Sequence, residues 1–198
     1  MWRVLLIPCV VAMAAVLAAP EVFAGDYGET TWGMSPASVK AVVKNMTLLQ
    51  EGPESLLYSG DVAVVPAEIA FRFHNSRLEE VVILFKRTYG KTDTELEAAA
   101  KADDYGKVVA LISGQYGNPL RSGANSLRPG SEEYCSRGNA EKMACVSFKK
   151  ISLSSLWETG DTRIVAQLTG EDERIVLRIR YSDKNSDSRH TPTGTGGL

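Results

Sequence analysis

The strongest constraint on the fold is a two-residue alternation of apolar and polar side chains near the C-terminus. In residues 174–181 every second side chain is apolar, and three of the four side chains between them are arginines. This period places one set on the buried face of a β-strand and the other on the opposite face. Residues 163–168 alternate in the same way, and 170–173 form a polar turn. The two segments therefore predict an antiparallel hairpin.

A second hairpin is predicted in the first half of the chain. Residues 69–74 alternate, His74–Arg77 is a polar turn, and 78–85 is rich in β-forming residues. Because Val81–Phe85 is apolar at every position, its second face must be covered by sheet curvature, a helix or a partner. Shorter strands are predicted at residues 56–59, 62–65, 144–148 and 151–157.

Two helices are predicted between these strands. Ser35 is placed to cap the first, Pro36 suits its first turn, and the apolar stripe continues to Met46 before residues 50–54 interrupt it. The second begins at residue 93 or 94 and ends at Tyr116, with a break near residue 103. Gly117 is a suitable residue to follow its end. Residues 120–131 are polar and predicted as loop.

The order of these elements predicts the fold class. Helix, strands, helix and strands follow one another, and each set of strands ends in a hairpin. We expect an α+β protein with helices packed on one face of an antiparallel sheet, in two α-then-β halves of about 32–87 and 93–182. Both halves belong to a single domain, residues 25–182.

The N-terminus has the pattern of an export signal. Arg3 precedes an apolar run, residues 4–17, and Val22–Ala24 supplies a cleavage site after Ala24. Cys9 lies inside the apolar run, so it is not interpreted as a lipoprotein cysteine. Residues 1–24 are therefore predicted to be a signal peptide, and the protein periplasmic or secreted from a bacterium, with no membrane span after cleavage. Residues 183–198 are polar and rich in Gly and Thr, which predicts a disordered tail.

Export decides the interpretation of the cysteines. Cys135 and Cys145 are the pair left after cleavage, and an even pair in an oxidising compartment usually forms a disulfide. The segment between them is polar and contains Gly138, so it can turn back. The sequence contains no C-x-x-C pattern, which would indicate a redox-active pair.

Two short signatures resemble those of small exported bacterial proteins. Trp32-Gly33-Met34-Ser35 precedes the first helix, and Tyr116-Gly117-Asn118-Pro119 follows the second. Trp157 and the closing segment Ile175–Tyr181 complete the pattern. The architecture is similar to that of BamE and of β-lactamase inhibitor proteins. The resemblance implies a role in binding other proteins, and it transfers no functional residue.

The sequence supplies no recognisable catalytic, cofactor or metal-binding set. Its two histidines are His74, at a predicted turn, and His190, in the predicted tail. Ser147–Lys150 matches S-x-x-K without the partner motifs of that chemistry, and Asp183–Asp187 matches only the start of a calcium loop. With 22 basic and 24 acidic residues, the net charge of -2 gives no general attraction to nucleic acid. We therefore predict no catalytic residues, no cofactor, no metal and no nucleic-acid partner.

Two surface features remain. The candidate binding face consists of arginines that alternation places on the outer side of the last hairpin: Arg163, Arg174, Arg178 and Arg180. Arg72 joins them if the halves share a sheet. Such a face is either a docking surface for an acidic protein or anionic polymer, or an ordinary solvated sheet face. Trp32 and Trp157 are either core residues or the lining of a recognition groove.

These observations lead to one functional hypothesis and one alternative. We predict a non-enzymatic periplasmic protein that binds a protein or an anionic envelope component through its sheet face. The alternative is a hydrolase or another enzyme whose site residues are too dispersed to recognise. No oligomeric state is predicted.

Overall fold

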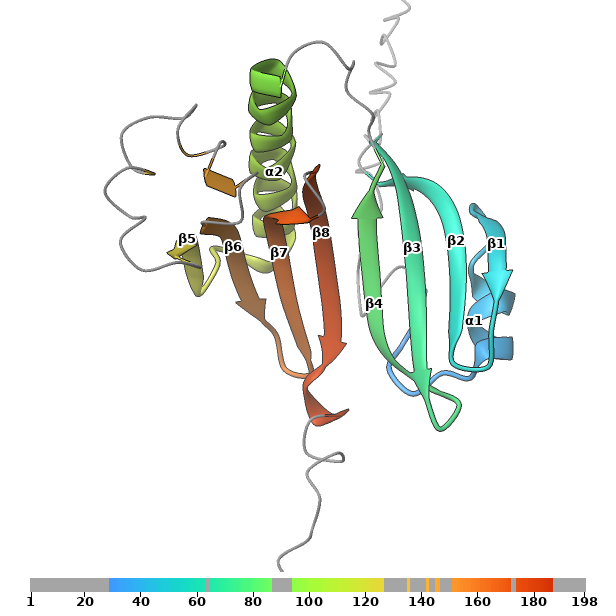
Figure 1. Cartoon of the computed structure of the whole chain (residues 1–198). Helices are drawn as coiled ribbons and strands as arrows, with labels where there is room; N and C mark the ends of the chain where they lie inside the picture. The colour runs from blue at the N-terminus through green and yellow to red at the C-terminus, as the bar shows by residue number, and fades with distance from the viewer. Residues whose placement is uncertain are drawn as a thin grey trace, which may run out of the picture.

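A computed structural model describes residues 29–62, 65–86, 94–126, 135, 142, 145–146, 151–171 and 174–186, with the side chains of 94–99, 126 and 174 left out (Figure 1). Its helices and strands are, in chain order, α1 (Pro36–Val42), β1 (Thr47–Glu51), β2 (Ser55–Val62), β3 (Val65–His74), β4 (Arg77–Phe85), α2 (Thr94–Tyr116), β5 (Arg121–Ser126), β6 (Ile151–Glu158), β7 (Thr162–Glu171) and β8 (Arg174–Asp183).

The strands form one continuous antiparallel sheet. Eight strands lie in the order β1-β2-β3-β4-β8-β7-β6-β5. The central β4–β8 pair joins strands β1–β4 to strands β5–β8, and we call these two sets of strands the two sides. The predicted fold class, helices packed on one face of a sheet in two α-then-β halves, is therefore wrong. A single sheet dominates the molecule, and α1 has only seven residues.

The β4–β8 register explains why the two sides merge. Val81 pairs with Tyr181, and Ile83 pairs with Ile179. All four side chains are at most 1% exposed. Separate halves would leave these side chains facing water along an open strand edge, so joining them buries apolar surface and pairs backbone groups together.

Two edge strands, β1 and β5, were not predicted, because their own sequences carry no strand pattern. Residues 121–126, predicted as loop, form β5, and 47–51, close to the predicted end of the first helix, form β1. Neither strand has an apolar-polar alternation in its sequence. Their backbones pair with β6 and β2 instead, so the neighbouring strand supplies the order that their own side chains do not.

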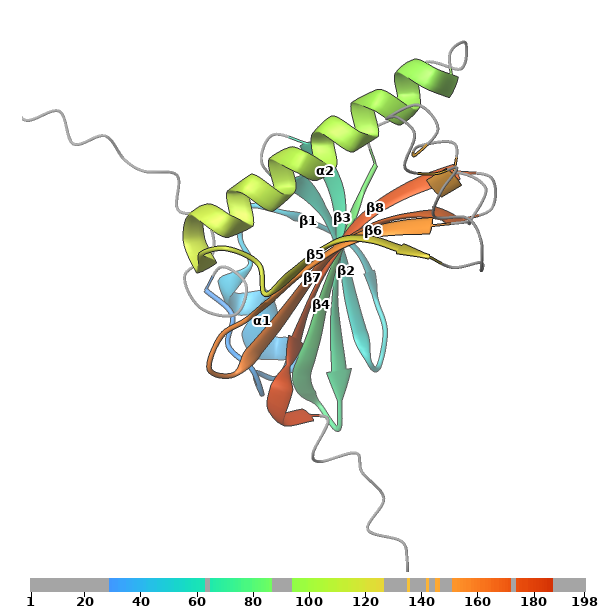
Figure 2. The ribbon, with the colours of Figure 1, turned by 90° about the vertical axis from the view of Figure 1, so that its left-hand side faces the viewer.

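The core lies on the face of the sheet that α2 contacts. Val108 and Ile112 of α2 are buried, and the helix packs against β7 and β8 (Figure 2). Tyr105 of α2 hydrogen-bonds through its hydroxyl to Ser155 of β6, at 2.9 Å. Val39 of α1 is also buried in this core. We call the opposite side of the sheet the outer face.

Several local predictions are confirmed. Ser35 caps α1 by accepting a hydrogen bond from the Ser38 amide, with Pro36 in the first turn. Antiparallel β3 and β4 form the predicted hairpin, and Asn75 and Ser76 both have positive φ at its tight turn. Gly117 follows α2 with a φ of 80°.

Other local predictions are wrong. Helix α2 runs without the break predicted near residue 103, and α1 ends at Val42 rather than Met46. Cys145 and Val146, predicted as strand, are helical.

The predicted signal peptide, residues 1–24, lies outside the described residues. The predicted tail starts within them: β8 continues to Asp183, which is 4% exposed, and Ser186 donates a hydrogen bond to the Asp183 carbonyl. Residues 187–198 lie outside the described part.

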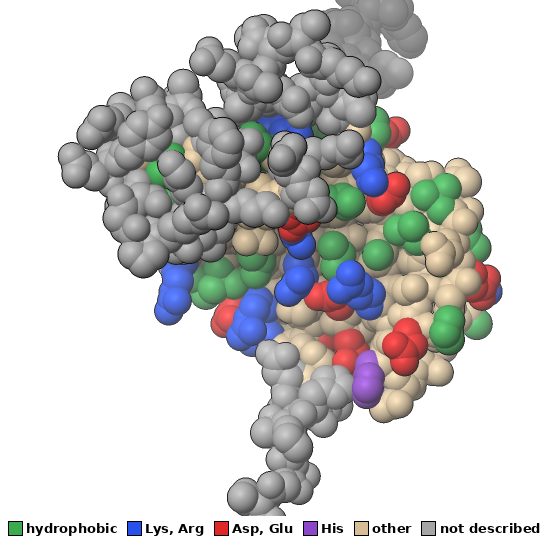
Figure 3. Space-filling model, in the orientation of Figure 1, with side chains coloured by type: hydrophobic (Ala, Val, Ile, Leu, Met, Phe, Trp, Pro, Cys, Tyr) green, Lys and Arg blue, Asp and Glu red, His purple; other side chains and the backbone are tan. Residues whose placement is uncertain are grey.

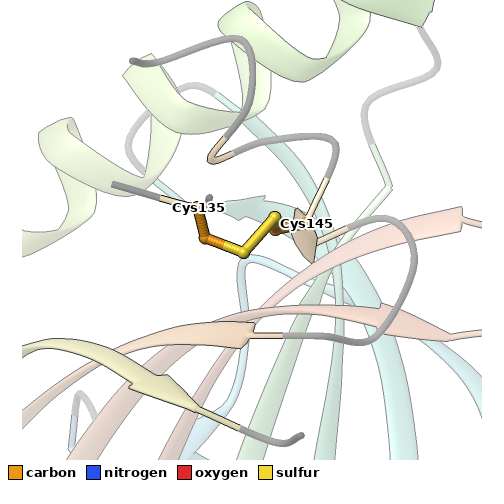
Figure 4. Close-up of a disulfide and its surroundings, with 2 residues drawn as sticks. All are labelled: Cys135 and Cys145. Atoms are coloured by element: carbon orange, nitrogen blue, oxygen red, sulfur yellow. A yellow bond between two sulfur atoms is a disulfide. The ribbon is translucent and has the colours of Figure 1, made fainter. Parts of the chain in front are cut away.

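The structure agrees with the predicted cysteine pair. The sulfur atoms of Cys135 and Cys145 lie 2.11 Å apart, the distance of a disulfide, and the side chains point toward each other (Figure 4). Both residues are buried in the core. The bond therefore closes a short loop within the segment that precedes β6, and both of its ends are buried in the core.

Removing this bond is expected to lower the free energy of unfolding by about 2–3 kcal/mol, because it closes a loop of 10 residues in the unfolded chain. The measurement is urea unfolding of the oxidised protein with and without reductant. A Cys135→Ser/Cys145→Ser variant is the control, since reductant should leave its midpoint unchanged. An unchanged midpoint in the reduced wild type without residues 1–24, with two free thiols by titration, would contradict the expectation.

Candidate binding face

Strand alternation builds the outer face. Along β8 the side chains of Ile175, Leu177 and Ile179 are buried, whereas Arg178 and Arg180 point to the other side. The neighbouring strands continue this pattern through their register. The outer face includes Leu57, Ser59, Glu68, Ala70, Arg72, Glu80, Val82, Leu84, Ser154, Leu156, Glu158, Arg163, Val165, Gln167, Arg178 and Arg180.

Three arginines lie near the centre of this face. Arg180 sits between Val82 of β4 and Val165 of β7. Arg178 sits one row along, between Leu84 and Gln167, and Arg72 reaches the same region from β3. We call Arg72, Arg178 and Arg180 the arginine cluster. Figure 3 shows basic, acidic and hydrophobic side chains interspersed on this face.

Each member of the arginine cluster pairs with a glutamate. Glu80 receives two of them: Arg72 Nη1 lies 2.7 Å from its Oε2, and Arg180 Nε lies 3.0 Å from its Oε1. Arg178 pairs with Glu171 at the end of β7. One carboxylate is therefore shared by two guanidinium groups.

A second shared carboxylate lies beside the cluster. Glu158 of β6 accepts from Arg163 Nε at 3.0 Å and lies 3.5 Å from Lys184 Nζ. The hydrogen bond from Arg163 is the main reason why the pKa of Glu158 is below its ordinary value, and the charge of Lys184 adds to it. Five cationic side chains in this region thus share three carboxylates.

Arg178 is the least solvated member of the cluster. Its side chain is 24% exposed, and its Nε atom is buried without a hydrogen-bond partner. Burial lowers the pKa of this guanidinium, and the positive charges of Arg180 and Arg72 lower it further. The group stays charged at neutral pH, so the repulsion is an unfavourable energy that the fold retains.

Aliphatic side chains fill the spaces between the charges. Leu57, Ala70 and Val82 occupy one row across β2, β3 and β4, and Val165 and Leu156 continue it beyond Arg180. All five are half-buried rather than covered. The face can therefore offer apolar contact area and charged groups to the same ligand.

The four arginines predicted to form the binding face come from two strands, Arg163 from β7 and the other three from β8. Arg163, Arg178 and Arg180 lie on the outer face as expected, and Arg72 lies on it as well. Arg174 pairs with Glu171 in the β7–β8 ladder, and its side chain is outside the described atoms. Their glutamate partners were not recognised, because ion pairing across strands depends on a register that one sequence does not show.

The two tryptophans pack rather than line a groove. Trp157 is 1% exposed and donates from Nε1 to the Gly117 carbonyl at 3.0 Å. Trp32 is half-buried, packs against the core, and donates from Nε1 to Thr162 Oγ1 at 2.8 Å. His74, an exposed residue at the end of β3, lies at the rim of the sheet.

Neither a membrane-spanning helix nor a metal-binding cluster of side chains occurs among the described residues. None of the helices in that part of the chain is long and apolar enough to span a membrane. Within the same residues, three or more His, Cys, Asp or Glu side chains do not gather where a metal ion could bind.

Comparison with known proteins gives no relative: no family model matches the chain, and neither does any curated protein or solved structure.

Proposed function

We propose that this chain is an exported, non-enzymatic protein that binds another protein or an envelope component through its outer face. The predicted signal peptide supports export, and the cysteine pair at disulfide distance is compatible with an oxidising compartment. The observation that carries the binding role is the composition of the outer face: a row of half-buried aliphatic side chains bordered by arginine–glutamate pairs.

An antiparallel sheet with one solvated face normally presents polar side chains there. Here Leu57, Val82 and Val165 lie on the outer face, the side of the sheet opposite to the core. Burial of such side chains by a partner is favourable at about 25 cal/mol per Å² of apolar surface. The surrounding ion pairs provide orientation, because misplaced like charges are repelled.

Photo-crosslinking in the cell that produces the protein tests this proposal. A photoreactive amino acid at Val82 or Val165 is expected to yield a defined crosslinked species, because these positions lie inside the proposed interface. The matched control is Lys107, whose side chain is 66% exposed on α2, on the other side of the sheet. Crosslinked species seen by gel and mass spectrometry from the outer face alone would support the proposal. No species, or the same ones from Lys107, would refute it.

A further inference from the structure

We propose that the arginine cluster is a docking site for carboxylate side chains of an acidic protein partner. This inference rests on the proposed function and specifies the chemistry of the partner. Arg72 and Arg180 approach Glu80 from β3 and β8, and each contacts a different oxygen of that carboxylate. Arg178 pairs with a different carboxylate, that of Glu171 at the end of β7. Three guanidinium groups thus face two carboxylates, and one positive charge is left without a counter-charge.

The cluster is accessible where it is needed. The side chains of Arg72 and Arg180 are 56% and 50% exposed, so their outward N–H groups can donate to a ligand while Glu80 holds them from within. A guanidinium has five N–H donors and matches a carboxylate in a two-point arrangement. An additional carboxylate over the cluster would offset the repulsion of Arg178 by its two neighbours.

The surroundings of the cluster favour a protein over a lipid surface or an anionic polymer. Val82, Leu84 and Val165 border the arginines, and such side chains contact the apolar side chains of a protein interface. Four glutamates lie within or beside the same face: Glu68, Glu80, Glu158 and Glu171. These carboxylates repel a dense array of phosphates, whereas a protein can place single acidic residues between them.

A pair of peptides tests the inference with the mature protein. The probe is a fluorescent eight-residue peptide of alternating Glu and Val, and its control replaces every Glu by Gln. The acidic peptide is expected to bind at least about tenfold more tightly at low salt. Fluorescence anisotropy measures both affinities, and vesicles containing phosphatidylglycerol serve as the competing anionic surface.

Three variants make the test specific. Arg72→Gln/Arg180→Gln is expected to weaken binding of the acidic peptide about tenfold, because two partly exposed ion pairs are lost. Glu80→Gln is expected to strengthen it about threefold, since it frees both arginines from their internal carboxylate. Lys107→Gln removes one positive charge far from the face, half the charge change of the double arginine variant, and should have no effect. Circular dichroism verifies that each variant is folded.

The outcomes separate this inference from the proposed function. Equal binding of the two peptides, no binding, or weaker binding by Glu80→Gln would overturn the inference, as would arginine-dependent binding to the vesicles in place of the peptide. Crosslinks from Val82 in cells would then still support a role in binding through the outer face. Crosslinks that fail while the acidic peptide binds would refute the proposed function alone.

Discussion

Replacement of Trp157 by alanine is expected to lower the free energy of unfolding by about 3–5 kcal/mol. This indole is 1% exposed on β6, and its neighbour in the ladder is Ile164 of β7. Its Nε1 also donates to the carbonyl of Gly117, the residue that follows α2. Truncation would leave a large cavity and would remove the acceptor's partner, so both the packing and the link between helix and sheet are lost.

Two further variants identify the source of this effect. Trp157→Phe keeps most of the ring but not the hydrogen bond, and is expected to cost about 1–3 kcal/mol. Leu156→Ala, at the adjacent half-buried position on the outer face, is expected to cost less than about 1.5 kcal/mol. Urea unfolding followed by circular dichroism measures all three. A Trp157→Ala loss no larger than that of Leu156→Ala would mean that the indole does not anchor the core.

The sequence predicted the features that depend only on residues close together along the chain. Alternation in 69–74 and 175–181 identified buried and outward side chains correctly, because a side chain's face depends only on its position along its own strand. The cap at Ser35 and the ending at Gly117 depend on equally local chemistry.

The arrangement of the strands was not predicted, because it depends on contacts between distant residues. Nothing in the sequence of 77–85 names 174–183 as its neighbour; the match of Val81 with Tyr181 and Ile83 with Ile179 appears only when the strands meet. The same holds for the candidate site. The two-residue alternation along the strands placed the arginines on one face. The sharing of Glu80 by Arg72 and Arg180, in contrast, requires that β3, β4 and β8 lie side by side.

If the sheet is one folding unit, damage at its centre should weaken both sides. Ile83→Ala removes a fully buried side chain from β4 where it pairs with Ile179 of β8, and is expected to lower the free energy of unfolding by about 2–5 kcal/mol. Because β4 and β8 share this contact, amides of β2 and β7 should lose protection from hydrogen exchange to the same extent.

Leu84→Ala is the matched control for this experiment, because Leu84 is the next residue of β4 but lies half-buried on the outer face. Its expected cost is below about 1.5 kcal/mol. Hydrogen exchange with mass spectrometry of both variants reports β2 and β7 separately. A loss confined to β1–β4, with β7 protected as in the wild type, would show that the two sides unfold independently. Loss of protection in both β2 and β7 is the expected result, because strands that share one buried core unfold together. The β4–β8 contact then couples the unfolding of β1–β4 to that of β5–β8.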